Sequence, residues 1–236
     1  MKRKIRALTI ILILAVLIPA LPGAPKYPGW QYWKSKKGIT LYKRKLEKSG
    51  IIEVRGETII NAAPEVLEAV IRDIPAYPQF MYECIIGREI KRYDDENIII
   101  LNVTKMPWPL KPRSVVVRTR VKKDFNRGKF SVALVGLPEG KSEQWVAPAK
   151  GRVRMHELTG TFIFKMIERK KCRVIYIVHA NPKGIPNFIV NLFVDDNPYG
   201  TLRGIKRMAK KEKYIELGKK SKYLPYIEKF FAAKNN

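Results

Sequence analysis

Apolar residues recur at two different spacings along this chain. Between Gly38 and Ala180 they largely alternate with polar residues, which is the spacing of half-buried β-strands. From Gly184 to Lys211 they recur every three or four positions, which is typical of an amphipathic helix. The pattern therefore predicts a region of strands that ends in a long helical segment. A helix laid on a curved sheet can enclose a space between the two.

Turn residues divide the β region. Ile39 to Leu46 and Ile51 to Ile60 flank Lys48-Ser49-Gly50 and predict a hairpin. A helix follows from about Pro64 to Asp73, with Asn61 as its expected cap.

The remaining strands follow one another without intervening helices, so the sheet is expected to be antiparallel. Asn126-Arg127-Gly128 is a strong hairpin signal, and Asp94-Asp95-Glu96 marks a second turn. The resulting order predicts an α+β domain with its helices on one side of a curved sheet. The expected strands are 83–93, 97–105, 114–125, 129–135, 151–157, 158–167 and 173–180, with a loop at 136–143.

The apolar stripe of the long helical segment changes phase midway. At about 100° per residue, Ile185 to Phe193 face one way, whereas Leu202, Ile205 and Ala209 face another. A straight helix cannot bury both sets against one surface, so a kink or break is expected near Asp195–Pro198.

The residues at this break explain it locally. Asn197 is a good N-cap and Pro198 a good first helical residue, so a second helix is expected from Pro198 to about Tyr214. Asp195 and Asp196 look like a catalytic pair, but helix ends and caps account for them without catalysis.

The N-terminus is basic and then apolar from Ala7 to Ile18. This run is short for a bilayer span of about 20 residues and fits a secretory signal. Since Pro25 follows Ala24, the cleavage site is poor, and an uncleaved anchor facing the periplasm is the alternative. We expect 1–24 to be a signal peptide or anchor and the protein to be exported.

The expected domain covers residues 25–214; it begins with an aromatic lead-in and is followed by a basic tail. The aromatic lead-in Pro25 to Lys37 is expected to be a helix on the domain or an interfacial belt. The basic and aromatic tail, residues 215–236, is expected to be an added amphipathic helix or loosely ordered.

The charge balance adds a class of partner. Forty-seven Lys and Arg against 21 Asp and Glu give a net charge of +26, which favours an anionic membrane surface or another polyanion. No nucleic-acid module is recognisable, so nucleic acid is not expected as a partner. The oligomeric state stays open.

Few residues suggest catalysis or metal binding. Cys84 and Cys172 lie in apolar strand-like surroundings and are expected to be free thiols, although a single bridge between them stays open. His156 and His179 stand singly among strand residues, a weak signal for proton transfer. We expect no metal, no cofactor and no catalytic residue.

Residues 106–114 read MPWPLKPRS, the helix from Val66 is followed by Asp73 and Tyr77, and an Ile185-Pro186 step follows the last expected strand. Together these three segments resemble the START (StAR-related lipid-transfer) domain family. The first is similar to the Trp-Pro-Leu-x-x-Arg-Asp segment of that family. Val66 to Tyr77 resemble its helix–Asp–x–x–x–Tyr pattern, and residues 179–191 resemble its last strand and the Ile-Pro start of its C-terminal helix. The matches span about Gly38 to Lys211. Ser114 stands where the family usually has Asp, so any ion pair of that Asp is absent.

The resemblance implies the helix-grip fold, a curved antiparallel sheet that grips a long C-terminal helix. It also implies a binding protein that holds one lipid, or another hydrophobic small molecule, between sheet and helix, for binding or transfer at the cell envelope. Trp108 is a candidate rim aromatic at the mouth. The other lipid-binding candidates, each of which core packing explains equally well, are Phe162, Phe164, Ile185, Phe188, Ile189, Leu192 and Phe193.

Two alternatives remain. Relatives in the same fold superfamily cyclise or hydrate polyketide-like substrates, and this activity needs titratable groups that converge on the pocket. A membrane-tethered polyanion-binding module would instead act through its basic surface, and salt would weaken its binding.

Overall fold

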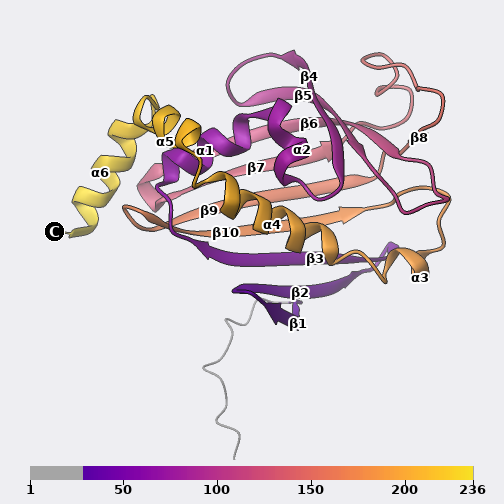
Figure 1. Ribbon diagram of the computed structural model, residues 1–236, viewed down its shortest axis with the longest axis horizontal. Coiled ribbons are helices and arrows are strands. Elements are labelled where there is room, and N and C mark those ends of the chain that lie inside the picture. The colour runs from indigo at the N-terminus through magenta and orange to yellow at the C-terminus, as the bar shows by residue number, and fades with distance from the viewer. Residues whose placement is uncertain (1–28, 236) are drawn as a thin grey trace, which may run out of the picture.

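The computed structural model describes residues 29–235. Its strands form one curved sheet in the order β1-β2-β3-β10-β9-β7-β6-β5-β4, and β8 pairs with β6 outside this path (Figure 1). The predicted α+β helix-grip class is confirmed. The strands are β1 (Gln31–Lys36), β2 (Ile39–Leu46), β3 (Ser49–Ile60), β4 (Cys84–Arg92), β5 (Asn97–Thr104), β6 (Arg113–Asp124), β7 (Lys129–Gly136), β8 (Val153–Arg154), β9 (Leu158–Glu168) and β10 (Lys171–Ala180).

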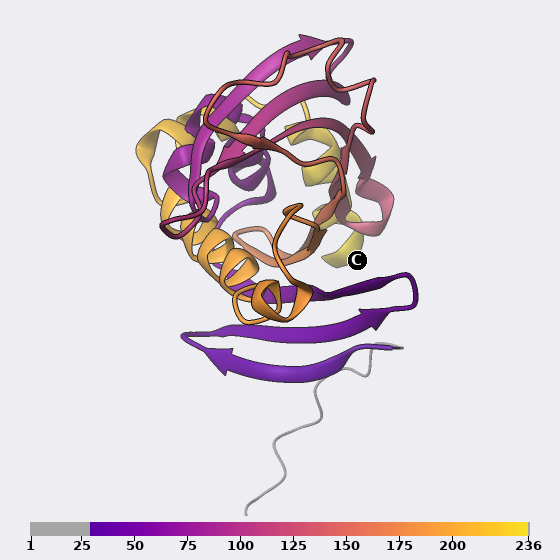
Figure 2. The same ribbon diagram turned by 90° about the vertical axis from the view of Figure 1, so that its right-hand side faces the viewer.

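The helices lie on the concave side of the sheet and at its two ends. Figure 2 shows the strands curving around the helices, with β1 and β2 at the bottom and β4 and β5 at the top. The helices are α1 (Pro64–Arg72), α2 (Tyr77–Phe80), α3 (Asn187–Val190), α4 (Asp196–Met208), α5 (Glu212–Lys219) and α6 (Leu224–Asn235), with 3-10 turns η1 (Ile74–Ala76) and η2 (Phe125–Arg127).

The predicted hairpins β2–β3, β4–β5 and β6–β7 are confirmed. The β6–β7 turn shows why they form. The side chain of Asp124 accepts a hydrogen bond from the backbone N–H of Arg127, at 3.3 Å. Gly128 then adopts a φ of 58°, in the left-handed region that favours glycine.

Four local predictions are wrong. The expected lead-in helix or belt at 25–37 is wrong where the structure describes it, because Gln31–Lys36 is an edge strand that pairs with the otherwise free edge of β2. The strand expected at 151–157 is reduced to Val153–Arg154 and runs parallel to β6. Asn61 does not cap α1, whose N-cap is Ala63. The expected second helix is divided, because α4 ends at Met208 and α5 begins at Glu212.

The predicted break in the C-terminal segment is confirmed, but the part before it is not a long helix. Only Asn187–Val190 is helical there, and turns lead into α4 at Asp196. The polar side chain of Asn191 fixes this stretch to β3. It accepts a hydrogen bond from the N–H of Ile52 and donates one to the carbonyl of Gly50, each at 2.9 Å.

α6 closes the end of the sheet opposite α3 (Figure 1). Ile227 and Phe231 are buried in the main core. The ring of Phe230 lies over Gly128, where a methyl group would come within 2.6 Å of its Cε1 atom. Residues 224–235 are therefore the helical alternative expected for the tail, and they extend the core.

Candidate functional site

The concave face of the sheet presents a layer of stacked aromatic rings. Phe162 and Phe164 on β9 are 1% and 0% exposed. The ring of Phe162 stacks on Tyr176 of β10 at 4.0 Å, and that of Phe164 stacks on Phe130 of β7 at 4.3 Å. The inward positions of three adjacent strands thus make a continuous apolar floor.

α4 packs within the same core. Leu202, Ile205 and Ala209, which form the second half of the apolar stripe, are 0%, 0% and 6% exposed, and Met208 beside them is 1% exposed. Close approach to the sheet is possible because Gly56 on β3 has no side chain. A methyl group at Gly56 would lie 2.8 Å from Cδ1 of Leu202. Sheet and helix therefore enclose an apolar interior.

One end of the molecule carries exposed apolar side chains on two segments. Trp108, in the β5–β6 loop, is 93% exposed. In the stretch around α3, Phe188, Leu192 and Phe193 are 70%, 67% and 56% exposed. We call the loop 105–112 together with 181–195 the Trp108 end, which faces the viewer in Figure 2. Isolated apolar residues are ordinary on a surface, but several together mark an interaction site.

A buried arginine connects the two segments of the Trp108 end. Arg113 is 4% exposed. It donates hydrogen bonds to the carbonyls of Lys111 at 2.6 Å, Pro182 at 2.8 Å and Lys183 at 3.0 Å. Burial lowers the pKa of its guanidinium. The arginine of the family-like motif thus fixes one segment of this end to the other.

The structure separates the predicted site residues into two groups. Phe162 and Phe164 lie in the interior. In the first half of the apolar stripe, Phe188, Leu192 and Phe193 are exposed, so the interpretation that they pack in the core is wrong. The reason is that the chain turns at residues 191–195 instead of continuing as a helix over the sheet. Contact with lipid remains a prediction for all of them. The second group of predicted site residues is exposed or half-buried and consists of Trp108, Ile185, Phe188, Ile189, Leu192 and Phe193.

Two polar groups at the start of α4 were missed by the sequence analysis. Oδ1 of Asn197 and the hydroxyl of Tyr199 are buried and have no hydrogen-bond partner among residues 29–235. Burying an unpaired polar atom costs about 1–3 kcal/mol, which makes such atoms candidates for a ligand's polar end. The predicted N-cap role of Asn197 is wrong, because α4 begins at Asp196 with Asp195 as its N-cap, and Asn197 lies in the first turn of the helix.

Ser114 replaces the family's Asp and makes a different contact. Its Oγ accepts a hydrogen bond from Nε of Arg154, at 3.1 Å. Arg154 also donates to the carbonyls of Val146 at 3.1 Å and Ala147 at 3.3 Å. Arg154 therefore fixes the loop after β7, and burial lowers the pKa of its guanidinium.

The two histidines belong to separate hydrogen-bonded groups. Nε2 of His179 lies 2.9 Å from Oγ of Ser49, whereas Nδ1 of His156 lies 3.2 Å from the carbonyl of Leu137. No group of three or more His, Cys, Asp or Glu side chains in residues 29–235 is placed to hold a metal ion.

Two surface pockets lie at the other end of the molecule, beside α5 and α6. Their volumes are about 340 and 320 Å³, and Lys222 and Tyr223 line both. Charged side chains such as Asp95 and Arg72 also line them, so neither pocket is an apolar lipid site.

Both cysteines are free and buried. Burial raises the pKa of Cys84 to about 11 and that of Cys172 to about 12. Because the thiolate is the reactive form, we expect neither thiol to react quickly with Ellman's reagent at pH 8. The same titration in guanidinium chloride should reveal both thiols. A fast-reacting thiol in the folded protein would contradict this expectation.

The curved sheet, the helix α4 packed on its concave face and the apolar interior between them define an α+β protein of the helix-grip class. The START domain family model matches residues 24–196, so the chain belongs to the START domain family.

Several known proteins are similar to this chain in sequence or in structure. An uncharacterized Pseudomonas aeruginosa protein, PA1579, is 28% identical over 181 residues, which cover 75% of this chain and 85% of that protein. The crystal structure of a STAR-related lipid transfer protein from Xanthomonas axonopodis has a TM-score of 0.70 at 28% identity, covering 78% of this chain and 99% of the other. Human STARD10 has a TM-score of 0.68 at 18% identity, covering 90% and 84%, and shows the shared fold.

In the part of the chain that the structure describes, every helix is too short or too polar to span a bilayer. The predicted leader, residues 1–24, lies outside that part.

Proposed function

We propose that this protein binds one lipid between the concave face of its sheet and α4, and exchanges it with a membrane of the cell envelope. The apolar interior of a START domain carries this proposal. Each CH₂ group moved from water into such an interior contributes about 0.8 kcal/mol, so an acyl chain or ring system suffices for tight binding. START domains bind hydrophobic ligands, and the choice of a lipid rests on the chemistry of the interior.

The Trp108 end is the proposed point of entry. Its exposed side chains are aromatic or aliphatic, and an indole is favoured at the boundary between lipid headgroups and acyl chains. Insertion of Trp108 and Phe188 would bring the start of α4 to the membrane surface. A lipid would then pass between bilayer and interior with little exposure to water.

The unpaired oxygens on α4 are proposed to orient the ligand. Asn197 Oδ1 accepts a hydrogen bond, and the Tyr199 hydroxyl both donates and accepts. A hydroxyl or amide group of the lipid would remove the cost of leaving these atoms unpaired. A wholly hydrocarbon ligand would leave that cost in place.

Binding requires part of the interior to open. The stacked rings of Phe162, Tyr176, Phe164 and Phe130 fill the floor on rigid strands. α4 is joined to the chain by turns on both sides, so it is the element that we propose moves. The protein is proposed to act after export, as a periplasmic protein or one anchored facing the periplasm.

Native mass spectrometry of the purified protein, followed by organic extraction and lipid analysis, tests the proposal. We expect one lipid per chain, and weaker retention of that lipid in an Asn197→Ala variant. A protein that is consistently empty and takes no lipid from liposomes would refute lipid exchange. That result would favour one of the two alternatives, a module that binds polyanions through its basic surface or an enzyme with cyclase- or hydratase-like activity.

A further inference from the structure

The outer face of the sheet is unusually basic along β6. Arg118, Arg120 and Lys122 occupy every second position of this strand and are exposed. Their neighbours Thr119 and Val121 point inward and are buried. Since successive side chains of a strand alternate between faces, the three charges lie on one side, about 7 Å apart along the strand.

A second set of charges crosses the neighbouring strands. Lys129 on β7 pairs directly with Lys165 on β9, and Lys165 pairs directly with Arg173 on β10. Like charges directly opposite one another on a sheet are destabilising. The three residues therefore form a row whose repulsion the fold tolerates. We call the set Arg118, Arg120, Lys122, Lys129, Lys165 and Arg173 the basic sheet face.

Most of this charge is not neutralised within the described residues. Lys129 lies 3.5 Å from Asp124. The other five members make no ion pair within residues 29–235. Elsewhere carboxylates do meet basic side chains, as Arg169 meets Glu65 at 2.6 Å. Selection for stability alone does not explain a self-repelling array in which five of the six charges make no ion pair within residues 29–235.

We propose that the basic sheet face binds the anionic surface of a lipid bilayer. The residues between the charges are small or aliphatic, namely Ser131, Ala133, Thr161 and Ile163, and the charges spread over four adjacent strands. Such a broad sheet face suits a plane of headgroups. Single-stranded nucleic acid would instead be expected to stack its bases on aromatic side chains, and the outward positions named here contain none.

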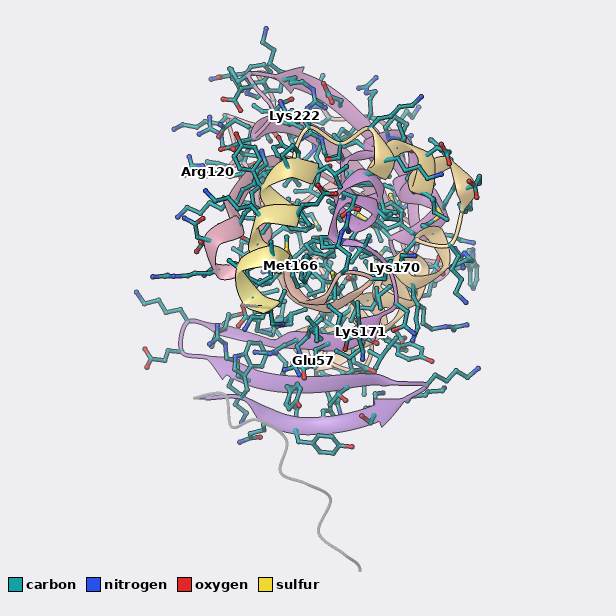
Figure 3. The ribbon with its side chains drawn as sticks, turned by 90° about the vertical axis from the view of Figure 1, so that its left-hand side faces the viewer. Glu57, Arg120, Met166, Lys170, Lys171 and Lys222 are labelled. Atoms are coloured by element: carbon teal, nitrogen blue, oxygen red, sulfur yellow. The ribbon has the colours of Figure 1, made fainter. Side chains whose placement is uncertain are left out.

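This contact goes beyond ligand binding, because it needs neither the interior nor the Trp108 end. Figure 3 shows Arg120 on the side of the sheet away from α4. A domain held by the basic sheet face therefore leaves α4 and the Trp108 end uncovered.

Vesicle co-sedimentation of the full chain tests the proposal. The first variant combines Arg118→Gln, Arg120→Gln and Lys165→Gln. The matched control combines Lys210→Gln, Lys220→Gln and Lys229→Gln, which removes the same charge from exposed positions on or next to the helices. Binding is measured on vesicles of phosphatidylcholine with and without 40% phosphatidylglycerol, and melting temperatures show that each variant folds.

Each Lys or Arg near an anionic surface contributes about fivefold to binding, so we expect the sheet variant to lose about 100-fold and the control much less. Its melting temperature at low salt should equal or exceed that of the wild type, because repulsion is relieved. Should the triple variant fold poorly, Arg120→Gln with Lys122→Gln replaces it, with an expected loss of about 25-fold.

Three outcomes would overturn the proposal. Equal losses in both variants would show that only net charge matters. Unchanged binding in the sheet variant would exclude this face. Binding of a single-stranded oligonucleotide through this face, without vesicle binding, would assign a different partner. Lipid content by mass spectrometry is read separately, so a failure here leaves the proposed ligand site untouched.

Discussion

Replacing Ile205 by alanine is expected to lower the free energy of unfolding by about 4 kcal/mol. Ile205 is 0% exposed and lies on the face of α4 that packs in the core. The substitution removes three buried carbon atoms and leaves a cavity that the rigid strands cannot fill. Urea unfolding followed by circular dichroism measures the change.

Leu192→Ala is the matched control, since it removes a similar volume from the other half of the same apolar stripe. Leu192 is 67% exposed, so its loss should change stability by less than about 0.5 kcal/mol. Equal effects of the two substitutions would mean that the segment before Asp195 packs as tightly as α4.

The second large effect is expected for Gly204→Ala. A methyl group at this position would overlap the carbonyl oxygen of Phe80 and lie 2.6 Å from its Cα atom. Backbone atoms cannot rotate away, so α4 would have to separate from α2. The expected loss is about 3 kcal/mol, although alanine is the better helix former by up to about 1 kcal/mol.

Gly200→Ala, in the same helix, controls for helix propensity. There the added methyl would overlap Cδ2 of the Tyr82 ring and lie 3.0 Å from its Cγ, but this is a side chain, which can turn aside. We expect a clearly smaller loss than at Gly204. Chemical denaturation of both variants measures their free energies of unfolding. A Gly204→Ala protein as stable as the wild type would show that α2 and α4 are not tightly packed.

Local patterns predicted much of the fold. Alternation located both strands of each hairpin, and the change of phase between Phe193 and Leu202 located the break before α4. These features depend on residues close together in the chain, where periodicity carries the information. Loop 137–152 and the parallel strand β8 depend instead on Arg154 and Ser114, which are far apart in the sequence.

The candidate site was predicted only in part, for a related reason. Periodicity indicates that Phe188 and Leu192 share a side, but it does not show whether the chain stays helical long enough to bury them. The deciding contacts are those of Asn191 with β3, across a sequence separation of 139 residues. The unpaired atoms of Asn197 and Tyr199 carry no local signal, because both residue types are ordinary in a first helical turn.

The position of α6 affects how a ligand bound as proposed would enter and leave the protein. If a ligand is held under α4 as proposed, α6 lies across one end of the sheet, and we expect entry and release at the Trp108 end. An incoming lipid and the bound one would then use the same passage. On that basis we expect the rate of release to limit exchange, so that adding more of a competing lipid does not speed the departure of the first.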